Sequence, residues 1–158
     1  LVGSEMCIRD RAQAMLGNPP LLILDEPTAG VDPYERVRIR SLIARVAQNH
    51  IVLLATHIVS DIECIANQVL LMNKGNLLKA GTAAELISSI ESKVAQRLCT
   101  EEEAEAYQQQ YGLGLLLQQQ AGQLLRLVGD QLPAEFEPAS GISLEEVYLY
   151  YCSSDSII

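Results

Sequence analysis

Two adjacent carboxylates, Asp25 and Glu26, directly follow the apolar run Leu21–Leu24. Four apolar residues without alternation predict a parallel strand buried on both faces, and Pro27 prevents direct continuation into a helix. Ligands of open α/β sheets bind outside the carboxyl ends of the strands, where a metal ion and its phosphates suit such carboxylates. An isolated Asp-Glu pair is more often a pair of solvated charges. The surrounding sequence must therefore show whether Asp25 and Glu26 form a ligand site.

A histidine, His57, leaves a second short apolar run, Ile51–Ala55, after one threonine. The β-branched, apolar composition of this run predicts another parallel strand. A lone histidine at a strand end is more often a partly exposed polar residue than a ligand. A functional role for His57 therefore depends on whether the motifs around it belong to a ligand site.

The segment between the two runs predicts a helix that begins at Pro33. Asp32 is a suitable N-cap, proline is favoured at the first helical position, and Glu35 stands at the third. Ile39, Leu42, Ile43 and Val46 then repeat at helical spacing, opposite Arg36 and Arg40. A strand, a helix and a strand in this order predict a right-handed βαβ crossover, which brings both strand ends to one edge of the sheet. One nucleotide there could contact Glu26 and His57.

The segment from Leu21 to Pro33 reads Leu-Leu-Ile-Leu-Asp-Glu-Pro-Thr-Ala-Gly-Val-Asp-Pro. It resembles the Walker B motif and the following D-loop of ATP-binding cassette (ABC) ATPases, and the joint pattern is highly specific. The resemblance implies that Asp25 helps to hold Mg²⁺ and that Glu26 orients and polarises the water that attacks the γ-phosphate of ATP. Such chemistry consists mostly of positioning and charge neutralisation.

The same resemblance assigns roles to two further residues. The spacing of His57 matches the switch histidine of the family, which contacts the γ-phosphate. D-loop residues Ala29 to Asp32 would cross a dimer interface and couple two nucleotide sites, while Asp32 also caps the helix. The resemblance thus places Asp25, Glu26, Asp32 and His57 at an ATP and Mg²⁺ site.

The resemblance implies an ATPase subunit that energises a separate membrane-spanning permease. It would work as a homodimer or heterodimer of nucleotide-binding domains, at the inner face of the cell membrane. One alternative is a soluble ABC ATPase outside transport, although Thr28-Ala29-Gly30-Val31-Asp32 favours the transporter type. Another is a non-catalytic remnant or partner-binding module. It is favoured by the absence of a glycine-rich phosphate loop from all 158 residues.

The amino-terminal residues depart from the family pattern. Leu1 to Arg11 stand where a Leu-Ser-Gly-Gly signature belongs, but they match it poorly, and the match resumes at Ala12. We expect residues 1–11 to be doubtful or non-native and Ala12 to Leu16 to be helical. The chain is accordingly expected to be a carboxyl-terminal fragment that does not hydrolyse ATP by itself.

The predicted fold class is α/β: part of a P-loop NTPase (ABC ATPase) parallel-sheet core at residues 12–89, followed by a small α+β accessory domain at residues 90–158. After His57 we expect a helix at 59–66, a hairpin of strands 68–72 and 76–80, and a capping box that opens at Thr82. The tail predicts a strand at 94–99, a helix at 101–111 and a hairpin of strands 115–120 and 124–128. Ser143 should cap a last helix.

The tail suggests which transporters the chain serves. Its end, Ser-Leu-Glu-Glu-Val-Tyr-Leu, resembles the accessory domain of ABC-2-type export systems. In the last helix, Leu144, Val147, Tyr148 and Tyr151 should share one apolar face.

The composition of the chain limits which kinds of partner and cellular location are expected. A net charge of −9 without clustered Lys or Arg argues against nucleic acid. No apolar stretch approaches the roughly 20 residues of a membrane span. The four cysteines are scattered and lack metal-ligand spacing, which favours reduced, mostly buried thiols and a cytoplasmic location.

Overall fold

The computed structural model describes residues 18–112, 114–119 and 122–153. The expectations for residues 1–11 and for a helix at 12–16 lie outside these residues. The chain divides into two compact units, residues 1–66 and residues 67–158. The predicted boundary after Ser89 was drawn from sequence resemblance, which a division in space does not test, and it stays a prediction.

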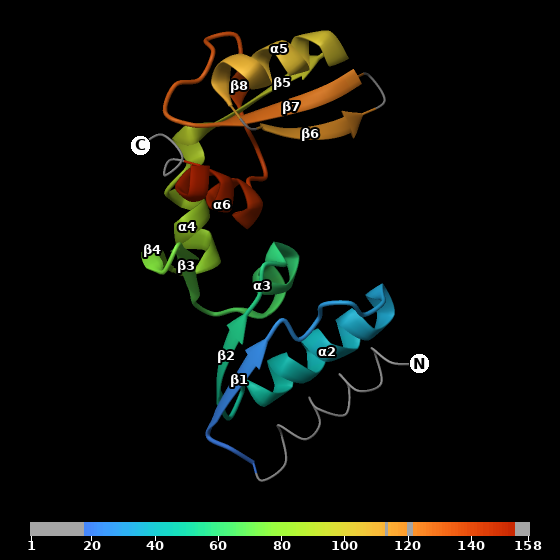
Figure 1. Ribbon diagram of the computed structural model, residues 1–158, viewed down its shortest axis with the longest axis vertical. Helices are drawn as coiled ribbons and strands as arrows, with labels where there is room; N and C mark the ends of the chain where they lie inside the picture. Colours follow the sequence, from blue (N-terminus) through green and yellow to red (C-terminus); the bar gives the residue numbers. More distant parts are fainter. Residues whose placement is uncertain (1–17, 113, 120–121, 154–158) are drawn as a thin grey trace. The chain divides into compact units, whose positions relative to one another are not determined.

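The first unit contains a parallel pair of strands joined by a helix, as predicted (Figure 1). Strand β1 runs from Leu21 to Asp25 and strand β2 from Ile51 to Ala55. Helix α2 (Pro33–Val46) connects them, and helix α3 (Val59–Ile65) follows β2. The fold of the described residues is therefore mixed α/β, with a strand–helix–strand unit at its start.

Helix α2 begins at Pro33 because the residue before it caps the helix. The Glu35 backbone N–H donates to the Asp32 carboxylate at 2.9 Å, which satisfies one of the amide groups that lack an intrahelical partner. Ile43 then packs with Leu22 and Leu24 in a small core. Of the predicted stripe, Leu42 is exposed instead, since it lies at the edge of the buried face.

The prediction that the strand at Leu21–Leu24 is buried on both faces is wrong for the described residues. Leu22 and Leu24 are buried, but Ile23 is 63% exposed, and Ile51 on β2 is 71% exposed. Helix α2 covers one face of the pair, and among the described residues nothing comparable covers the other. Within residues 18–112, 114–119 and 122–153, this pair thus has an uncovered apolar face.

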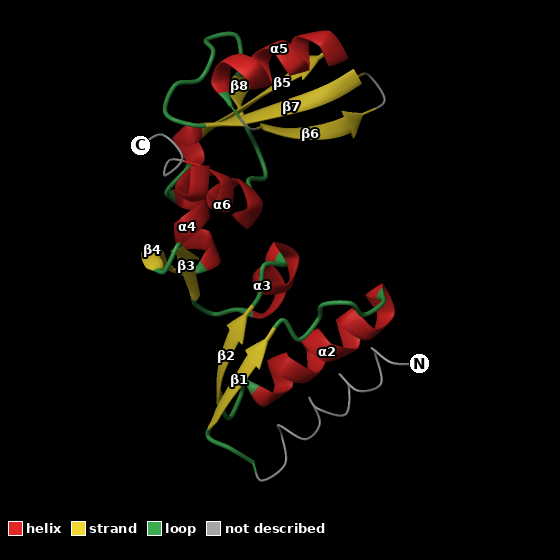
Figure 2. Cartoon of the chain, in the orientation of Figure 1, coloured by secondary structure: helices red, strands yellow, loops and turns green. Residues whose placement is uncertain are grey.

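The second unit agrees closely with the predicted order of elements (Figure 2). Its first half consists of a hairpin, a helix that opens with the predicted capping box at Thr82, and a short 3-10 helix. These elements are β3 (Val69–Asn73), β4 (Asn76–Gly81), α4 (Ala83–Ser88) and the 3-10 helix at Glu91–Lys93.

The second half of this unit is built on a four-stranded antiparallel sheet, with strand order β6-β7-β5-β8. Helix α5 packs on one face of the sheet through Ala104, which belongs to a core with Leu125, Leu127 and Phe136. The elements are β5 (Val94–Cys99), α5 (Glu101–Tyr111), β6 (Gly114–Gln119), β7 (Gly122–Val128), β8 (Glu137–Pro138) and α6 (Leu144–Ser153).

The buried face of α6 differs from the predicted one. Leu144 and Val147 are buried as expected, but Tyr148 is exposed and Glu146 is buried in its place. Glu146 is accepted in the interior because Arg126 and Ser143 donate hydrogen bonds to its carboxylate. A binary hydrophobic pattern cannot anticipate such a buried polar residue.

No helix among the described residues is long and apolar enough to cross a membrane. The described cysteines form no disulfide: Cys99 is buried, Cys152 is half-buried and Cys64 is exposed. Burial raises the pKa of the Cys99 thiol.

Candidate functional site

The carboxyl ends of β1 and β2 meet at one edge of their pair, which brings the predicted site residues together. Asp25 lies opposite Ala55 in the strand register. The Glu26 backbone N–H then donates to the Ala55 carbonyl at 2.8 Å, so the ladder reaches one residue beyond β1. This hydrogen bond fixes Glu26 beside the segment that carries His57.

Glu26 has an unusual backbone conformation, and both oxygens of its carboxylate have hydrogen-bond partners. Its φ angle is 45°, a left-handed conformation that is uncommon outside glycine. One carboxylate oxygen accepts the Thr56 hydroxyl at 2.8 Å, and the other lies 2.9 Å from the His57 backbone nitrogen and 2.6 Å from His57 Nδ1. The loop after β2 therefore holds the carboxylate in one orientation.

These contacts decide the charge of Glu26. Burial raises the pKa of its carboxyl group, but hydrogen bonds from His57 and Thr56 outweigh burial and hold the pKa below its ordinary value. Glu26 is therefore ionised at neutral pH. An ionised, oriented carboxylate can accept a hydrogen bond or a proton from water.

His57 faces solvent while it contacts Glu26. Its side chain is 81% exposed and that of Glu26 is 33% exposed. Nδ1 is engaged by Glu26, which leaves Nε2 on the other side of the ring. Both side chains can therefore be reached by a ligand at this edge.

Asp25 is exposed at the end of β1, and its carboxylate has no hydrogen-bond partner among the described residues. The described residues contain no group of three or more His, Cys, Asp or Glu side chains that could hold a metal ion. Mg²⁺ keeps several waters and binds phosphate oxygens, so it needs only one or two carboxylates from the protein. Asp25, with Glu26 beside it, fits such a site.

Asp32 lies farther along the loop and caps α2, as described above. Its neighbours Ala29 and Gly30 are exposed, and Gly30 has a φ angle of 70°, which favours glycine. The structure does not bring Asp32 into hydrogen-bond contact with Glu26 or His57. Its assigned place at a nucleotide site remains a prediction.

A buried polar network behind this edge was missed by sequence reasoning. The Thr28 hydroxyl donates to the Asp61 carboxylate, and both residues are 1% exposed. Arg40 Nη1 lies 3.4 Å from the other Asp61 oxygen and 3.5 Å from Cys64 Sγ. Arg40 thus joins α2 to α3, although the sequence placed it on the face of α2 opposite the core. No local pattern marks Asp61, since its partners are distant in the sequence.

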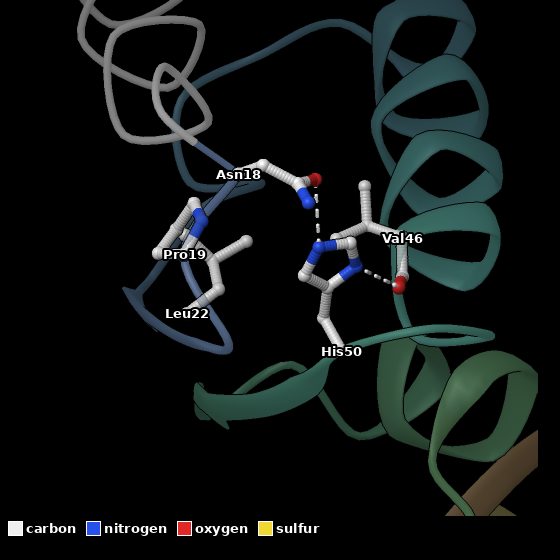
Figure 3. A pocket seen from close by; sticks show the side chains of 5 residues that line it. All are labelled: Asn18, Pro19, Leu22, Val46 and His50. Atoms are coloured by element: carbon white, nitrogen blue, oxygen red, sulfur yellow. Dashed lines mark hydrogen bonds between the residues drawn. The ribbon is translucent and has the colours of Figure 1, made fainter.

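A small hollow lies at the opposite, amino-terminal end of the strand pair (Figure 3). His50 Nδ1 is 3.0 Å from the Val46 carbonyl and Nε2 is 2.9 Å from the Asn18 side-chain oxygen. Both ring nitrogens are thereby used to tie the end of α2 to the segment before β1. We assign His50 a structural role, and the candidate site remains at the other end of the strands.

Comparisons with known proteins find ATP-binding proteins of ABC transporters among the sequence relatives. No family model matches the chain. It is 38% identical over 91 residues to the energy-coupling factor transporter ATP-binding protein EcfA2 of Streptococcus pneumoniae, covering 57% of this chain and 33% of that protein. An uncharacterized ABC transporter ATP-binding protein of Nostoc is 35% identical over 79 residues (49% of this chain, 24% of that protein). ABC transporter ced-7 of Caenorhabditis elegans is 35% identical over 78 residues (49% of this chain, 4% of that protein).

Two solved structures overlap the chain less well. The ATP binding subunit of an ABC transporter gives a TM-score of 0.38 at 31% identity, over 45% of this chain and 30% of the other. A putative metal-chelate type ABC transporter gives 0.48 at 24% identity, over 89% and 48%. Because both scores are below 0.5, the assignment rests on the sequence relatives.

The parallel strands that deliver Asp25, Glu26 and His57 to one edge, together with these relatives, define the class as ABC-type ATP-binding proteins. The chain carries part of an ABC transporter ATP-binding subunit. It spans about one third of the length of the Streptococcus relative and less of the other two.

Proposed function

We propose that this chain belongs to the subunit that binds ATP, hydrolyses it to ADP and phosphate, and thereby energises a separate membrane permease. The observation that carries the proposal is the Glu26 carboxylate, 2.6 Å from Nδ1 of the exposed His57 where two parallel strands end. This pair follows a Walker B-like strand, and the curated relatives are ATP-binding proteins of transporters.

Each side chain has a role that its surroundings support. Glu26 orients and polarises the attacking water, since its carboxylate is ionised and held by the Thr56 and His57 contacts. His57 presents Nε2 to an oxygen of the terminal phosphate. Asp25 would hold Mg²⁺, which would supply the positive charge that neutralises the phosphates.

The partners follow from the same family. The exposed loop at residues 29–32 faces a second nucleotide-binding domain, and Asp32 couples the two nucleotide sites while it caps α2. The complex works at the inner face of the cell membrane through its permease. The tail, which resembles the accessory domain of ABC-2-type systems, favours export, whereas the names of the relatives do not specify direction.

The 158 residues by themselves do not hydrolyse ATP under this proposal. Without a phosphate loop they lack the backbone amides and the lysine that hold the β- and γ-phosphates. Incubation of the purified chain with Mg-ATP should release no phosphate above a protein-free control. Turnover that Glu26→Gln abolishes would show that this part of the proposal is wrong.

The main test uses the complete subunit that contains these residues together with a phosphate loop. Glu26→Gln should lower kcat by about 10²- to 10⁴-fold, because it removes the group that activates water. ATP affinity should stay nearly unchanged, because the amide keeps the size of the side chain and one of its two accepting oxygens. Phosphate release and equilibrium binding of a fluorescent ATP analogue measure the two effects.

The matched control is Glu102→Gln, the same chemical change at an exposed carboxylate of α5. It should leave both quantities unchanged. Normal hydrolysis by the Glu26→Gln subunit would overturn the role of Glu26.

A further inference from the structure

Strand β6 forms one edge of the four-stranded sheet in the second unit, and within the described residues only β7 pairs with it. Its sequence, Gly-Leu-Leu-Leu-Gln-Gln, contains neither a charge nor a proline. Natural edge strands are usually protected by charged residues, proline, bulges or a covering segment, because their unpaired backbone groups invite another strand. The outer edge of β6 carries none of the sequence devices.

The strand register shows which backbone groups face outward. Gln119 and Gly122 are opposite each other with two residues between them, and the pair that closes such a hairpin exchanges both backbone hydrogen bonds, so the groups of Gln119 face β7 and those of Gly114, five residues away, face outward. The Gly114 carbonyl accepts the Gln108 side-chain amide at 3.1 Å. Backbone groups of alternate residues in an antiparallel strand point to the same side. The N–H and C=O groups of Leu116 and Gln118 therefore also point outward, while those of Leu117 pair with β7.

A row of leucines crosses the sheet and ends at this edge. Leu98 on β5, Leu124 on β7 and Leu117 on β6 are directly opposite one another in the strand register. Leu124 in the middle is 9% exposed, whereas Leu98 and Leu117 are 45% and 43% exposed. The row lies on the face opposite α5, because Leu125, the next residue along β7, belongs to the α5 core. Leu117 thus extends an apolar surface to the open edge.

We propose that two copies of this chain pair through their β6 edges, antiparallel about a two-fold axis at Leu117. In this register Leu116 stands opposite the partner's Gln118 and Gln118 opposite the partner's Leu116, so the outward backbone groups satisfy one another. Leu117 meets the partner's Leu117, and the two leucine rows join into one continuous row of six. The inference does not depend on the proposed ATPase activity.

A second copy fits this edge better than an unrelated strand for two reasons. Leu117 on the two-fold axis meets the partner's Leu117, so the half-exposed end of each leucine row is covered by the same apolar side chain of the other copy. The chain carries a net charge of −9, but β6 is uncharged, so two copies can approach along it without opposing carboxylates. A six-residue strand buries little area, so the dimer is weak and concentration-dependent.

The register is tested by cysteine cross-linking of the full 158-residue chain. A non-hydrogen-bonded antiparallel pair has Cα atoms about 4.5 Å apart, within disulfide range, so Leu117→Cys should form a disulfide-linked dimer under mild oxidation. Leu115→Cys is the matched control. It faces the partner's position 119 and lies roughly 13 Å from the partner's position 115, at about 3.3 Å per residue, so it should not cross-link.

Combining Leu115→Cys with Gln119→Cys should restore the cross-link. Peptide mass spectrometry distinguishes these disulfides from any that involve native cysteines. Cross-linking of Leu115→Cys alone, or none with Leu117→Cys, would overturn the proposed register.

The backbone contribution is tested by Gln118→Pro, which removes an outward N–H without breaking a hydrogen bond to β7. It should raise the dimer dissociation constant at least about tenfold, whereas Gln118→Ala, which keeps the N–H, should change it less than about threefold. Sedimentation equilibrium measures the constant, and circular dichroism checks the fold. A chain that stays monomeric at all concentrations, or a dimer indifferent to Gln118→Pro when the variant is folded, would refute the pairing.

Discussion

Two charged pairs, one in each unit, have similar contact distances but opposite surroundings. His57 Nδ1 lies 2.6 Å from Glu26 at the ends of β1 and β2, and Arg126 Nη1 lies 2.9 Å from Glu146 between β7 and α6. The His57 side chain is largely exposed, whereas the side chain of Glu146 is 1% exposed. The first pair can be reached by a ligand, and the second is closed to one.

The partners of each pair reinforce this difference. Arg126 also donates to the Gln96 side chain and to the Ser140 and Gly141 carbonyls, so one guanidinium ties β5, β7 and the loop before α6 together. The Glu26 carboxylate is held, among the described residues, by Thr56 and His57, the two residues that follow β2. Burial and the number of partners therefore separate a pair that holds elements together from a pair placed for chemistry.

The largest expected effect on stability comes from breaking the buried pair. Glu146→Ala leaves the Arg126 charge without its counter-ion in the interior and should lower the free energy of unfolding by about 3 kcal/mol. Urea denaturation followed by far-UV circular dichroism measures this quantity. Glu145→Ala, at the exposed neighbouring carboxylate, should cost less than about 0.5 kcal/mol. Equal losses in the two variants would contradict the structural role of Glu146.

Acid should weaken the same pair. Burial raises the pKa of Glu146, but hydrogen bonds from Ser143 and Arg126 outweigh burial and lower it below the ordinary value. Since the folded-state pKa is the lower one, the stabilisation is complete above the unfolded-state pKa of about 4.3 and is lost as the pH falls through the folded-state pKa. Unfolding measured from pH 7 down to acid should show this loss in the wild type, and Glu146→Ala should show less of it.

A smaller loss of stability is expected at the buried network of the first unit. Asp61→Ala removes the acceptor of the Thr28 hydroxyl and the partner of Arg40, and should cost about 2 kcal/mol. Amide hydrogen exchange of β1 and β2 reports on this unit. The control is Ser60→Ala, at the exposed neighbour. If exchange in Asp61→Ala matched the control, the network would not support the site.

The helix cap should contribute less again. Asp32→Ala removes the acceptor for the Glu35 backbone N–H and should destabilise α2 by about 1 kcal/mol, whereas Asp32→Ser keeps a capping oxygen and should cost only a few tenths. Hydrogen exchange in the first turn of α2 measures both. In the complete subunit, Asp32→Ser tests coupling separately: a loss of cooperativity in ATP hydrolysis with normal helix stability would support a role beyond the cap.

The smallest effect concerns the exposed pair itself. The hydrogen bonds from His57 and Thr56 hold the pKa of Glu26 below its ordinary value. His57→Ala removes the Nδ1 contact but keeps the backbone N–H, so the pKa should rise without reaching that of an uncontacted glutamate. A carbon-detected NMR titration of the Glu26 carboxyl group, in the wild type and in the variant, measures this. A Glu26 pKa unchanged in His57→Ala would mean that the contact contributes nothing to its ionisation.

The sequence predicted those features that depend on neighbouring residues or on strand ends. Asp32 caps α2 and Thr82 opens a capping box because both interactions span three residues. Glu26 and His57 meet because parallel strands end at the same edge. The networks around Asp61 and Arg126 could not be predicted, because they depend on which elements pack together.

Short elements, and residues at the edge of a buried face, were not predicted correctly for related reasons. Strand β8 has two residues and shows no periodicity, so its pairing with β5 left no trace in the sequence. Tyr148 was placed on the buried face of α6 because an amphipathic pattern gives the direction of the face and not its exact edge. Glu146 was overlooked there because a charged residue counts against burial until its partners are known.

The left-handed backbone of Glu26 has a consequence for how position 26 would drift during evolution. A non-glycine residue at a φ angle of 45° costs of order 1 kcal/mol, and glycine or asparagine would relieve that cost. Such a replacement would also remove the carboxylate contacts to Thr56 and His57, so at position 26 a backbone cost is set against side-chain hydrogen bonds. Sequencing position 26 in close relatives would show whether glutamate is kept there only where Asp25 and His57 are kept as well.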